Sequence, residues 1–310
     1  MKKLNLLLGT LIATAALSHA VDSYSDVVGY NKLSFPTGNS AQAATFVKPS
    51  VFTGTATSKT LNSITVSSAS FGSLGPVGGL PTHYVKITSG SMNGYVLDIL
   101  SNTSTSITID GDLSTAGSTP SFVIRPHVKA SDLFRGNTDL SPGSDTMTIY
   151  NANGTSTVML WVGSDSTTGW INPVTEAELD GIIYPGEGFI LTTQKSGSFT
   201  FQGSVETLPT VTPLFPGVVN LVSLSSPNAS TKDLQLINLG LNMAPGSDTV
   251  QFLSKTGSLS SAGVYLWAGT DGFIDAVTES PAAVNVDAAE VLNVTVVSPT
   301  TWQTPAPYTP

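Results

Sequence analysis

Short runs of apolar and polar residues, separated by turn residues, make up most of the chain after residue 20. The runs are rich in Val, Ile, Thr and Tyr and end at Gly, Ser, Asn or Pro, which is the pattern of β-strands. They recur at a spacing of roughly 8–15 residues, typical of β-sandwiches and barrels rather than of alternating strands and helices. The pattern predicts strands at residues 63–67, 84–88, 94–100, 106–109, 121–125, 146–150, 158–162, 188–193, 198–202, 218–224, 249–253, 264–268 and 291–297.

Signals for helices are few. Residues 131–134 (SDLF) predict one short turn, and residues 232–239 are ambiguous. Residues 175–180 (TEAELD) predict a second short helix, because Thr175 suits a helix N-cap and carboxylates follow it in the first turn. The expected fold class is therefore all-β with few short helices.

Several segments occur twice at a nearly constant offset. Residues 142–146 (PGSDT) return at 245–249, and residues 160–165 (LWVGSD) resemble 266–271 (LWAGTD). The triplet VTE at 174–176 also returns, at 277–279, and residues 27–34 resemble 218–224. We interpret these matches as an internal duplication of about 100 residues.

The duplication suggests how the chain is divided. The first β-module is expected at residues 21–49 plus 123–208, and the second at residues 209–310. Residues 50–122 carry strands of their own and are expected to form a small, inserted β-barrel-like module. The predicted architecture is thus two tandem, related β-sandwich or barrel-like modules with a third inserted into the first.

The N-terminus has the three parts of a secretory signal peptide. Lys2 and Lys3 precede an apolar stretch at 4–17, and small residues precede Val21. This pattern predicts cleavage after residue 20 and export to the periplasm, the cell surface or the medium. No later segment is apolar over the roughly 18 residues that a membrane-spanning helix needs.

Composition excludes several functions. The chain is acidic, with 12 Lys and Arg against 21 Asp and Glu and a net charge of −9. It has no basic stripe that would neutralise phosphates, so we expect no nucleic-acid partner. With no Cys, it has no disulfide, thiol nucleophile or Cys-ligated metal.

Taken together, these features resemble an uncharacterised paralogous family of secreted β-rich proteins from verrucomicrobial-type bacteria. The segments that carry the resemblance are residues 27–36 (VVGYNKLSFP), 48–54 (KPSVFTG), 84–94 (YVKITSGSMNG), 121–126 (SFVIRP), 185–191 (PGEGFIL) and 201–204 (FQGS). The second module departs from the pattern, with DAAE at 287–290 where the first has PGEG. The resemblance implies export and a β-rich structure, and it implies no catalytic residues.

Catalytic motifs are scarce. His83 and His127 are the only histidines after the signal peptide, and neither lies in a metal-binding spacing. The chain has no GxSxG or SxxK nucleophile motif. A carboxylate-based glycosidase is an alternative that would use two acids about 5–9 Å apart. Its candidates are Glu176, Glu178, Asp180 and Glu187 in the first module and Glu279, Asp287 and Glu290 in the second.

Repeated turn aspartates suggest calcium. Asp145 and Asp248 lie in the PGSDT turns, and Asp165 and Asp271 lie in the turns that follow the repeated tryptophans. Secreted β-modules often use such carboxylates to bind Ca²⁺. The alternative, which we favour, is that each turn aspartate accepts hydrogen bonds from its own backbone.

Repeated aromatic residues suggest carbohydrate binding. We expect Trp161 and Trp267, which have apolar neighbours, to lie in the core. Trp170 and Phe273 follow a glycine, and exposed rings there would stack on sugars.

The sequence therefore favours an exported, non-enzymatic protein of the cell surface, envelope or matrix with a structural or adhesive role. Partners would be further copies of the chain, through unprotected strand edges, or an envelope polysaccharide. Carbohydrate binding and glycoside hydrolysis are the alternatives.

Overall fold

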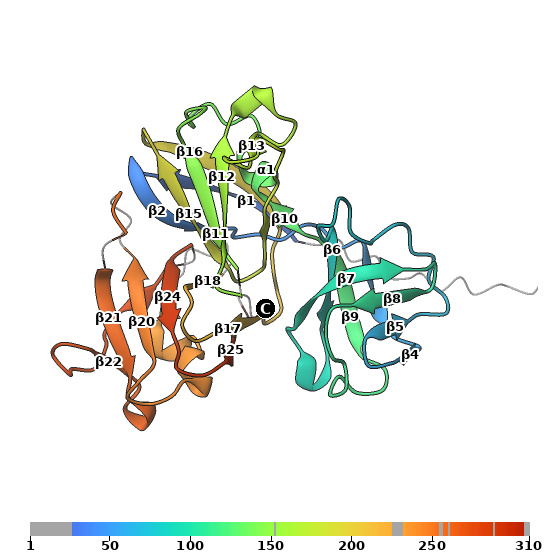
Figure 1. The fold of residues 1–310 in the computed structure, drawn as a ribbon. Coiled ribbons are helices and arrows are strands. Elements are labelled where there is room, and N and C mark those ends of the chain that lie inside the picture. The colour runs from blue at the N-terminus through green and yellow to red at the C-terminus, as the bar shows by residue number, and fades with distance from the viewer. Residues whose placement is uncertain are drawn as a thin grey trace, which may run out of the picture.

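The computed structural model describes residues 27–151, 153–224, 232–253, 257–259, 261–287 and 289–306. These residues form an all-β fold of three lobes around a common centre, as Figure 1 shows. The expected signal peptide at 1–20 lies outside the described residues.

The first lobe contains β1 (Val28–Phe35), β2 (Gly38–Ala43), β10 (Val128–Lys129), α1 (Ala130–Phe134), β11 (Thr146–Tyr150), β12 (Ser156–Trp161), η2 (Gly163–Asp165), β13 (Trp170–Ile171), β14 (Ile182–Ile183), β15 (Gly188–Thr193) and β16 (Gly197–Ser204). The inserted lobe contains β3 (Phe52–Thr55), β4 (Ser58–Lys59), β5 (Ser63–Thr65), β6 (His83–Ile87), η1 (Gly90–Met92), β7 (Val96–Asn102), β8 (Ser106–Ile109) and β9 (Ser121–Pro126). The second lobe contains β17 (Val211–Leu214), β18 (Asn220–Ser223), β19 (Lys232–Asp233), η3 (Leu234–Leu236), η4 (Leu239–Asn242), β20 (Thr249–Leu253), β21 (Ser261–Trp267), η5 (Gly269–Asp271), β22 (Phe273–Asp275), β23 (Asn285–Val286), β24 (Val291–Thr295) and β25 (Thr300–Gln303).

The first lobe packs a five-stranded antiparallel sheet against the long β1–β16 ribbon. The sheet has the order β13-β12-β11-β15-β2. Alternation decides its buried face, because Met147 and Ile149 of β11 point inward while their neighbours are partly exposed. Phe199 and Phe201 of the ribbon complete the core from the other side.

The second lobe repeats this arrangement. Its sheet has the order β22-β21-β20-β24-β18, strand for strand the order of the first lobe, and β17 pairs with β25 as β1 pairs with β16. In this topology β18 takes the place of β2. The proposed match of residues 27–34 with 218–224 is therefore wrong, because β1 belongs to the ribbon and β18 to the sheet.

The inserted lobe is one seven-stranded sheet with the order β3-β9-β6-β7-β8-β5-β4. The chain runs directly from one edge strand, β3, to the other, β4, so the sheet curls around its own core of Ile, Val and Phe side chains. All of β9 pairs with β3 and β6. The expected boundary between residues 122 and 123 cuts this strand, and the insert instead extends through Pro126.

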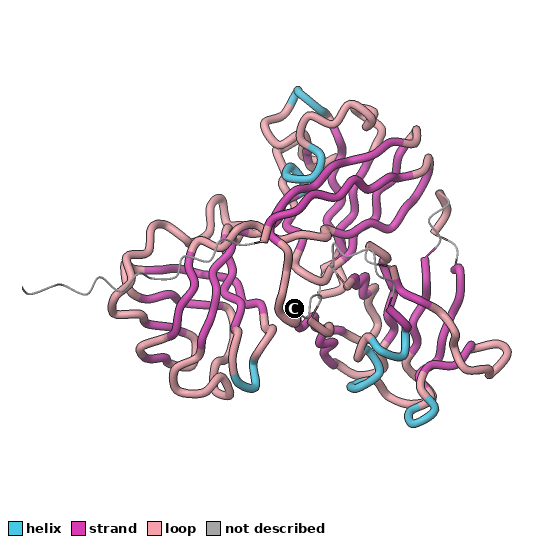
Figure 2. The backbone as a smooth tube through the Cα atoms, turned by 180° about the vertical axis from the view of Figure 1, so that it is seen from behind, coloured by secondary structure: helices cyan, strands magenta, loops and turns pink. Residues whose placement is uncertain are grey.

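Helices are short and lie at the ends of the lobes (Figure 2). The turn predicted at 131–134 is present as α1. The helix predicted at 175–180 is wrong: Asn172 accepts the backbone N–H groups of Val174 and Thr175, and Glu176 has a φ of 54°. None of the helices in the described part of the chain has the length and apolarity needed to cross a membrane.

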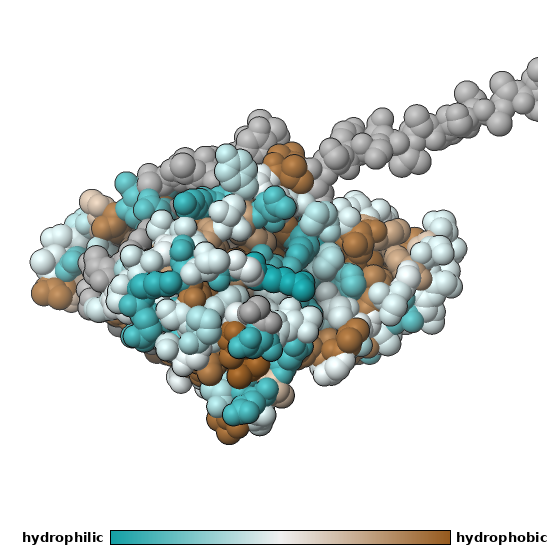
Figure 3. All heavy atoms as spheres, turned by 90° about the horizontal axis from the view of Figure 1, so that it is seen from above, coloured by the Kyte–Doolittle hydropathy of each residue, from teal (hydrophilic) through white to brown (hydrophobic). Residues whose placement is uncertain are grey.

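The first and second lobes pack through the outer faces of their sheets. Ala41 and Ala43 of β2 and Ile190 of β15 contact Leu221 of β18 and Val291 of β24. On the face seen from above, hydrophobic residues form small separate patches among polar ones (Figure 3).

The inserted lobe reaches the second lobe at Gly94. The Val211 N–H donates to the Gly94 carbonyl at 2.9 Å, and Tyr95 forms a parallel bridge with Val211. Gly94 has a φ of 98°, and a Cβ atom there would lie 2.9 Å from the Pro209 carbonyl oxygen. Only glycine permits this approach without a shift of the backbone.

We predict that Gly94→Ala destabilises the protein by about 2–4 kcal/mol, because it combines a left-handed backbone with a steric clash. Gly117→Ala is the matched control, since Gly117 has a φ of 75° and open space around it. The control should lose only about 1 kcal/mol. Urea unfolding followed by tryptophan fluorescence measures both, and equal losses would contradict a tight junction at Gly94.

Candidate functional site

The centre of the molecule holds a buried ion pair between lobes. Lys86 of β6 has no exposed surface, and its Nζ lies 2.8 Å from Oε2 of Glu206. Glu206 lies between β16 and β17, on the link that joins the first and second lobes. Burial lowers the pKa of Lys86, and the Glu206 carboxylate opposes this shift. Lys86 also donates to the Thr210 hydroxyl at 3.0 Å, so one side chain of the insert holds the link at two points.

A second polar cluster, in which His127 is buried and Asp98 and Tyr184 are partly buried, joins the insert to the first lobe. Asp98 of β7 receives the Tyr184 hydroxyl at 2.7 Å on one oxygen, and His127 Nε2 lies 3.0 Å from the other. Burial, followed by the hydrogen bond and charge of Asp98, raises the pKa of Tyr184 above its usual value. The His127 ring also lies between Tyr84 and Tyr184, with ring centroids 5.0 Å away on each side. His127 thus has the structural role expected of an isolated histidine.

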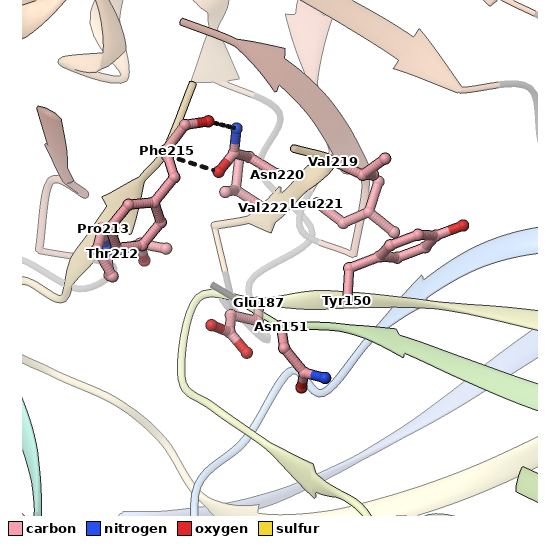
Figure 4. A pocket seen from close by; sticks show the side chains of 10 residues that line it. All are labelled: Tyr150, Asn151, Glu187, Thr212, Pro213, Phe215, Val219, Asn220, Leu221 and Val222. Carbon is pink, nitrogen blue, oxygen red and sulfur yellow. Dashed lines mark hydrogen bonds between the residues drawn. The ribbon is translucent and has the colours of Figure 1, made fainter. Parts of the chain in front are cut away.

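An open cavity of about 390 Å³ lies beside this cluster, where the three lobes meet. Val96 comes from the insert, Tyr184 and Glu187 from the first lobe, and Thr212 and Pro213 from the second. Figure 4 shows the adjoining pocket, with Glu187 on one side and Thr212 and Pro213 on the other. The Thr212 hydroxyl is buried without a hydrogen-bond partner in the described structure.

Glu187 is the most perturbed acid of this region. Loss of water around its carboxyl raises its pKa to about 7, the nearby charge of Asp98 adds to the shift, and a hydrogen bond from the Tyr184 backbone opposes it. A carboxyl with this pKa changes charge near neutral pH.

The aromatic residues predicted to bind sugars are buried. Trp170 has no exposed surface and Phe273 is 1% exposed, so neither presents a ring face to solvent. Trp170 packs edge-on against Trp161, and Phe273 packs against Trp267. The prediction of a stacking platform at Trp170 and Phe273 is therefore wrong.

The aspartates of the PGSDT turns hold backbone groups. Asp145 accepts the Ser141 N–H on one oxygen and the Gln194 N–H on the other, both at 2.8 Å. Asp248 accepts the Ala244 and Val297 N–H groups in the same way, at 2.7 and 2.9 Å. Both side chains are buried. This is the backbone-binding alternative, and each aspartate ties its turn to the end of a neighbouring strand.

Asp165 and Asp271 are exposed in the short turns η2 and η5, and the structure does not bring them to the turn aspartates. Among the described residues, no three His, Asp or Glu side chains form a group that could hold a metal ion. Calcium binding stays a prediction, and the experiment on Asp145 below tests it.

The candidate glycosidase acids are held by different segments. Asp180 accepts two hydrogen bonds from Ser131, Glu178 accepts the Thr167 N–H at 2.6 Å, and Glu290 accepts the Asp287 N–H at 3.1 Å. Of these acids, only Glu187 lines the cavity at the centre. Its acidic neighbour Asp98 is already bound by Tyr184 and His127.

Sequence reasoning did not identify the central groups Lys86, Glu206, Asp98 and Tyr184. A lysine within the apolar run YVKIT was the one available signal for Lys86. Nothing local to the sequence indicates that the other three meet it, because they come from distant segments.

No protein-family model, curated protein or solved structure matches the chain. The proposed function therefore rests on the geometry of the chain itself.

We predict that Asp145→Ala destabilises the protein by about 2–5 kcal/mol, because two buried N–H groups lose their acceptor. Asp165→Ala is the exposed control and should change stability by less than about 0.5 kcal/mol. The melting temperature of Asp145→Ala should lie below that of Asp165→Ala both with calcium and with chelator. A chelator-induced fall in the wild-type melting temperature that Asp165→Ala removes would establish the calcium site instead.

We also predict that Glu187→Gln stabilises the protein selectively at high pH. The folded protein holds the Glu187 proton up to a pKa of about 7, whereas the unfolded chain releases it near pH 4.3. Stability is therefore lost as pH rises through this window. Relative to wild type, the variant should gain up to about 3 kcal/mol between pH 4 and pH 8. Urea unfolding at both pH values measures this gain, and a constant difference would contradict the raised pKa.

Proposed function

We propose that the protein is an exported, non-enzymatic component of the cell surface, envelope or matrix with a structural or adhesive role. The observation that carries this proposal is the use of ionisable groups at the centre. Lys86 pairs with Glu206, while Asp98 accepts the Tyr184 hydroxyl and lies 3.0 Å from His127 Nε2, and these contacts join the lobes. Groups bound in this way are not free to act on a substrate.

The surface agrees with this proposal. Several of its carboxylates accept hydrogen bonds within the molecule, as Asp180, Glu178 and Asp275 illustrate. The lobes are locked to one another by buried contacts. A protein whose lobes are joined in this way holds the loops on its surface at fixed distances from each other.

The export signal in residues 1–20 supports placement outside the cytoplasm. A membrane-impermeant amine reagent, applied to intact producing cells, should label the protein as strongly as it does after lysis. Exposed lysines such as Lys195 provide the reactive groups. A cytoplasmic protein of the same cells is the control and should be labelled only after lysis. Labelling of the protein only after lysis would contradict the proposal.

A further inference from the structure

The same exposed loop occurs in the first and second lobes. We call residues 172–177 the first tip and residues 275–280 the second tip. In the first tip the Glu176 N–H donates to the Asn172 carbonyl at 2.9 Å, and the Asn172 N–H donates to Ala177 at 2.8 Å. The second tip has the same two bonds at 2.9 and 2.8 Å, between Glu279 and Asp275 and between Asp275 and Ser280. Two hydrogen bonds close each tip into a fixed shape.

Each tip presents a valine and a glutamate to solvent. Val174 is 87% exposed and Val277 is 88% exposed. Within residues 172–183 and 275–286, the triplet Val-Thr-Glu is the only identity between the lobes. Neither packing nor burial accounts for retaining Val and Glu at these positions.

The two glutamates also have an unfavourable backbone conformation. Glu176 and Glu279 have φ values of 54° and 56°, and Asn238 is the only other non-glycine residue at positive φ in the described chain. Glycine would relieve this strain, and the chain uses it at many other left-handed positions. This strain at exposed positions marks the two glutamates as candidates for a role at the surface.

A cavity of about 610 Å³ in the first lobe has the complementary chemistry. We call it the socket; Arg135, Leu140, Pro142, Trp161, Ser166 and Thr167 are among the residues that line it. Arg135 follows α1 and is exposed. Its backbone N–H donates to the Ser131 carbonyl at 3.0 Å, and among the described residues its guanidinium has no hydrogen-bond or ion-pair partner. Lys195 adds a second cation at the rim, where its Nζ lies 3.3 Å from the Thr138 carbonyl. Two acids lie next to this lining: Glu178, which is bonded to Thr167 and Ser166, and Asp165, which is exposed and precedes Ser166 in the chain.

The second lobe differs from the first at the positions that form the socket. Its loop between Trp267 and Phe273 is three residues shorter than the loop between Trp161 and Trp170, which supplies Ser166 and Thr167 to the socket wall. The corresponding stretch of the second lobe, residues 232–243, contains no arginine. The residues that form the socket in the first lobe are thus not reproduced in the second lobe, which carries the second tip.

We propose that the second tip of one copy binds the socket of another copy, with Val277 against the apolar lining and Glu279 paired with Arg135. Charge complementarity favours this occupant, since an acidic tip meets an unpaired arginine in a chain of net charge −9. The two surfaces lie on different lobes, so the contact is head-to-tail and leaves a free tip and a free socket at the ends. Contacts of this type build open chains of copies. The inference rests on the proposed structural role and gives its molecular basis.

Sedimentation velocity of the purified protein, from about 1 µM to about 1 mM, tests the proposal. Wild type should associate with rising concentration, and 0.5 M salt should weaken the association because it screens the charge pair. Arg135→Glu and Glu279→Lys should each reduce the association constant at least about tenfold. Mixing the two variants should restore association, because each supplies the charge that the other lacks.

Glu176→Lys is the matched control, since it makes the same change in the first tip and should leave association unaltered. Glu279→Gly tests the strain directly: it should weaken association without lowering the melting temperature. A monomeric wild type at every concentration would overturn the proposal, as would unchanged association of Arg135→Glu or failure of the mixture to recover. If the protein is monomeric but the amine reagent labels it on intact cells, this inference is wrong and the proposed function is unaffected.

Discussion

The buried pair of Lys86 and Glu206 fixes how the three lobes stand relative to one another. Taking both charges out of water is costly, and the protein recovers that energy only when the ammonium and carboxylate meet. Apolar contacts tolerate sliding, whereas this pair, at 2.8 Å, does not. The Asp98 cluster with His127 and Tyr184 provides a second fixed point on the same insert. Two such points and the close contact at Gly94 define one orientation of the insert.

Within the first and second lobes, one buried aspartate each holds two backbone segments together. Asp145 and Asp248 each bind one N–H of their own turn and one N–H at the end of the adjacent strand. The two lobes thus share strand order, turn geometry and the buried carboxylate. Their outer sheet faces then pack on each other through small and branched side chains such as Ala41, Leu221 and Val291. The same local solutions therefore recur in two halves that differ at most other positions.

The alternating pattern predicts most of the fold, because many half-buried strands leave a periodic signal. The list of expected strands nevertheless omits β1 and β2, which have eight and six residues. The thirteen strands expected from the sequence are all present, whereas two-residue strands such as β10 and β14 are too short to show alternation. Strand β6 is buried on both faces, so its sequence shows no alternation that would tell whether Lys86 points to solvent or into the protein. Gly169 was read as a sign of exposure for Trp170, yet a Cβ at Gly169 would lie 2.3 Å from the Trp161 ring. That glycine makes room for aromatic packing, and only the three-dimensional contact reveals this.

The differences between the two lobes matter more for function than their likeness. Identical lobes with identical tips and sockets would give copies no preferred polarity, because every contact could form in four combinations. The longer loop before Trp170 and the unpaired Arg135 give the first lobe a feature that the second lacks. In the second lobe, the Gln235 side chain donates to the carbonyl of Phe273 and accepts its N–H. Two lobes of the same strand order, of which one carries the longer loop and Arg135, give a unit with two distinct ends, as the proposed chain of copies requires.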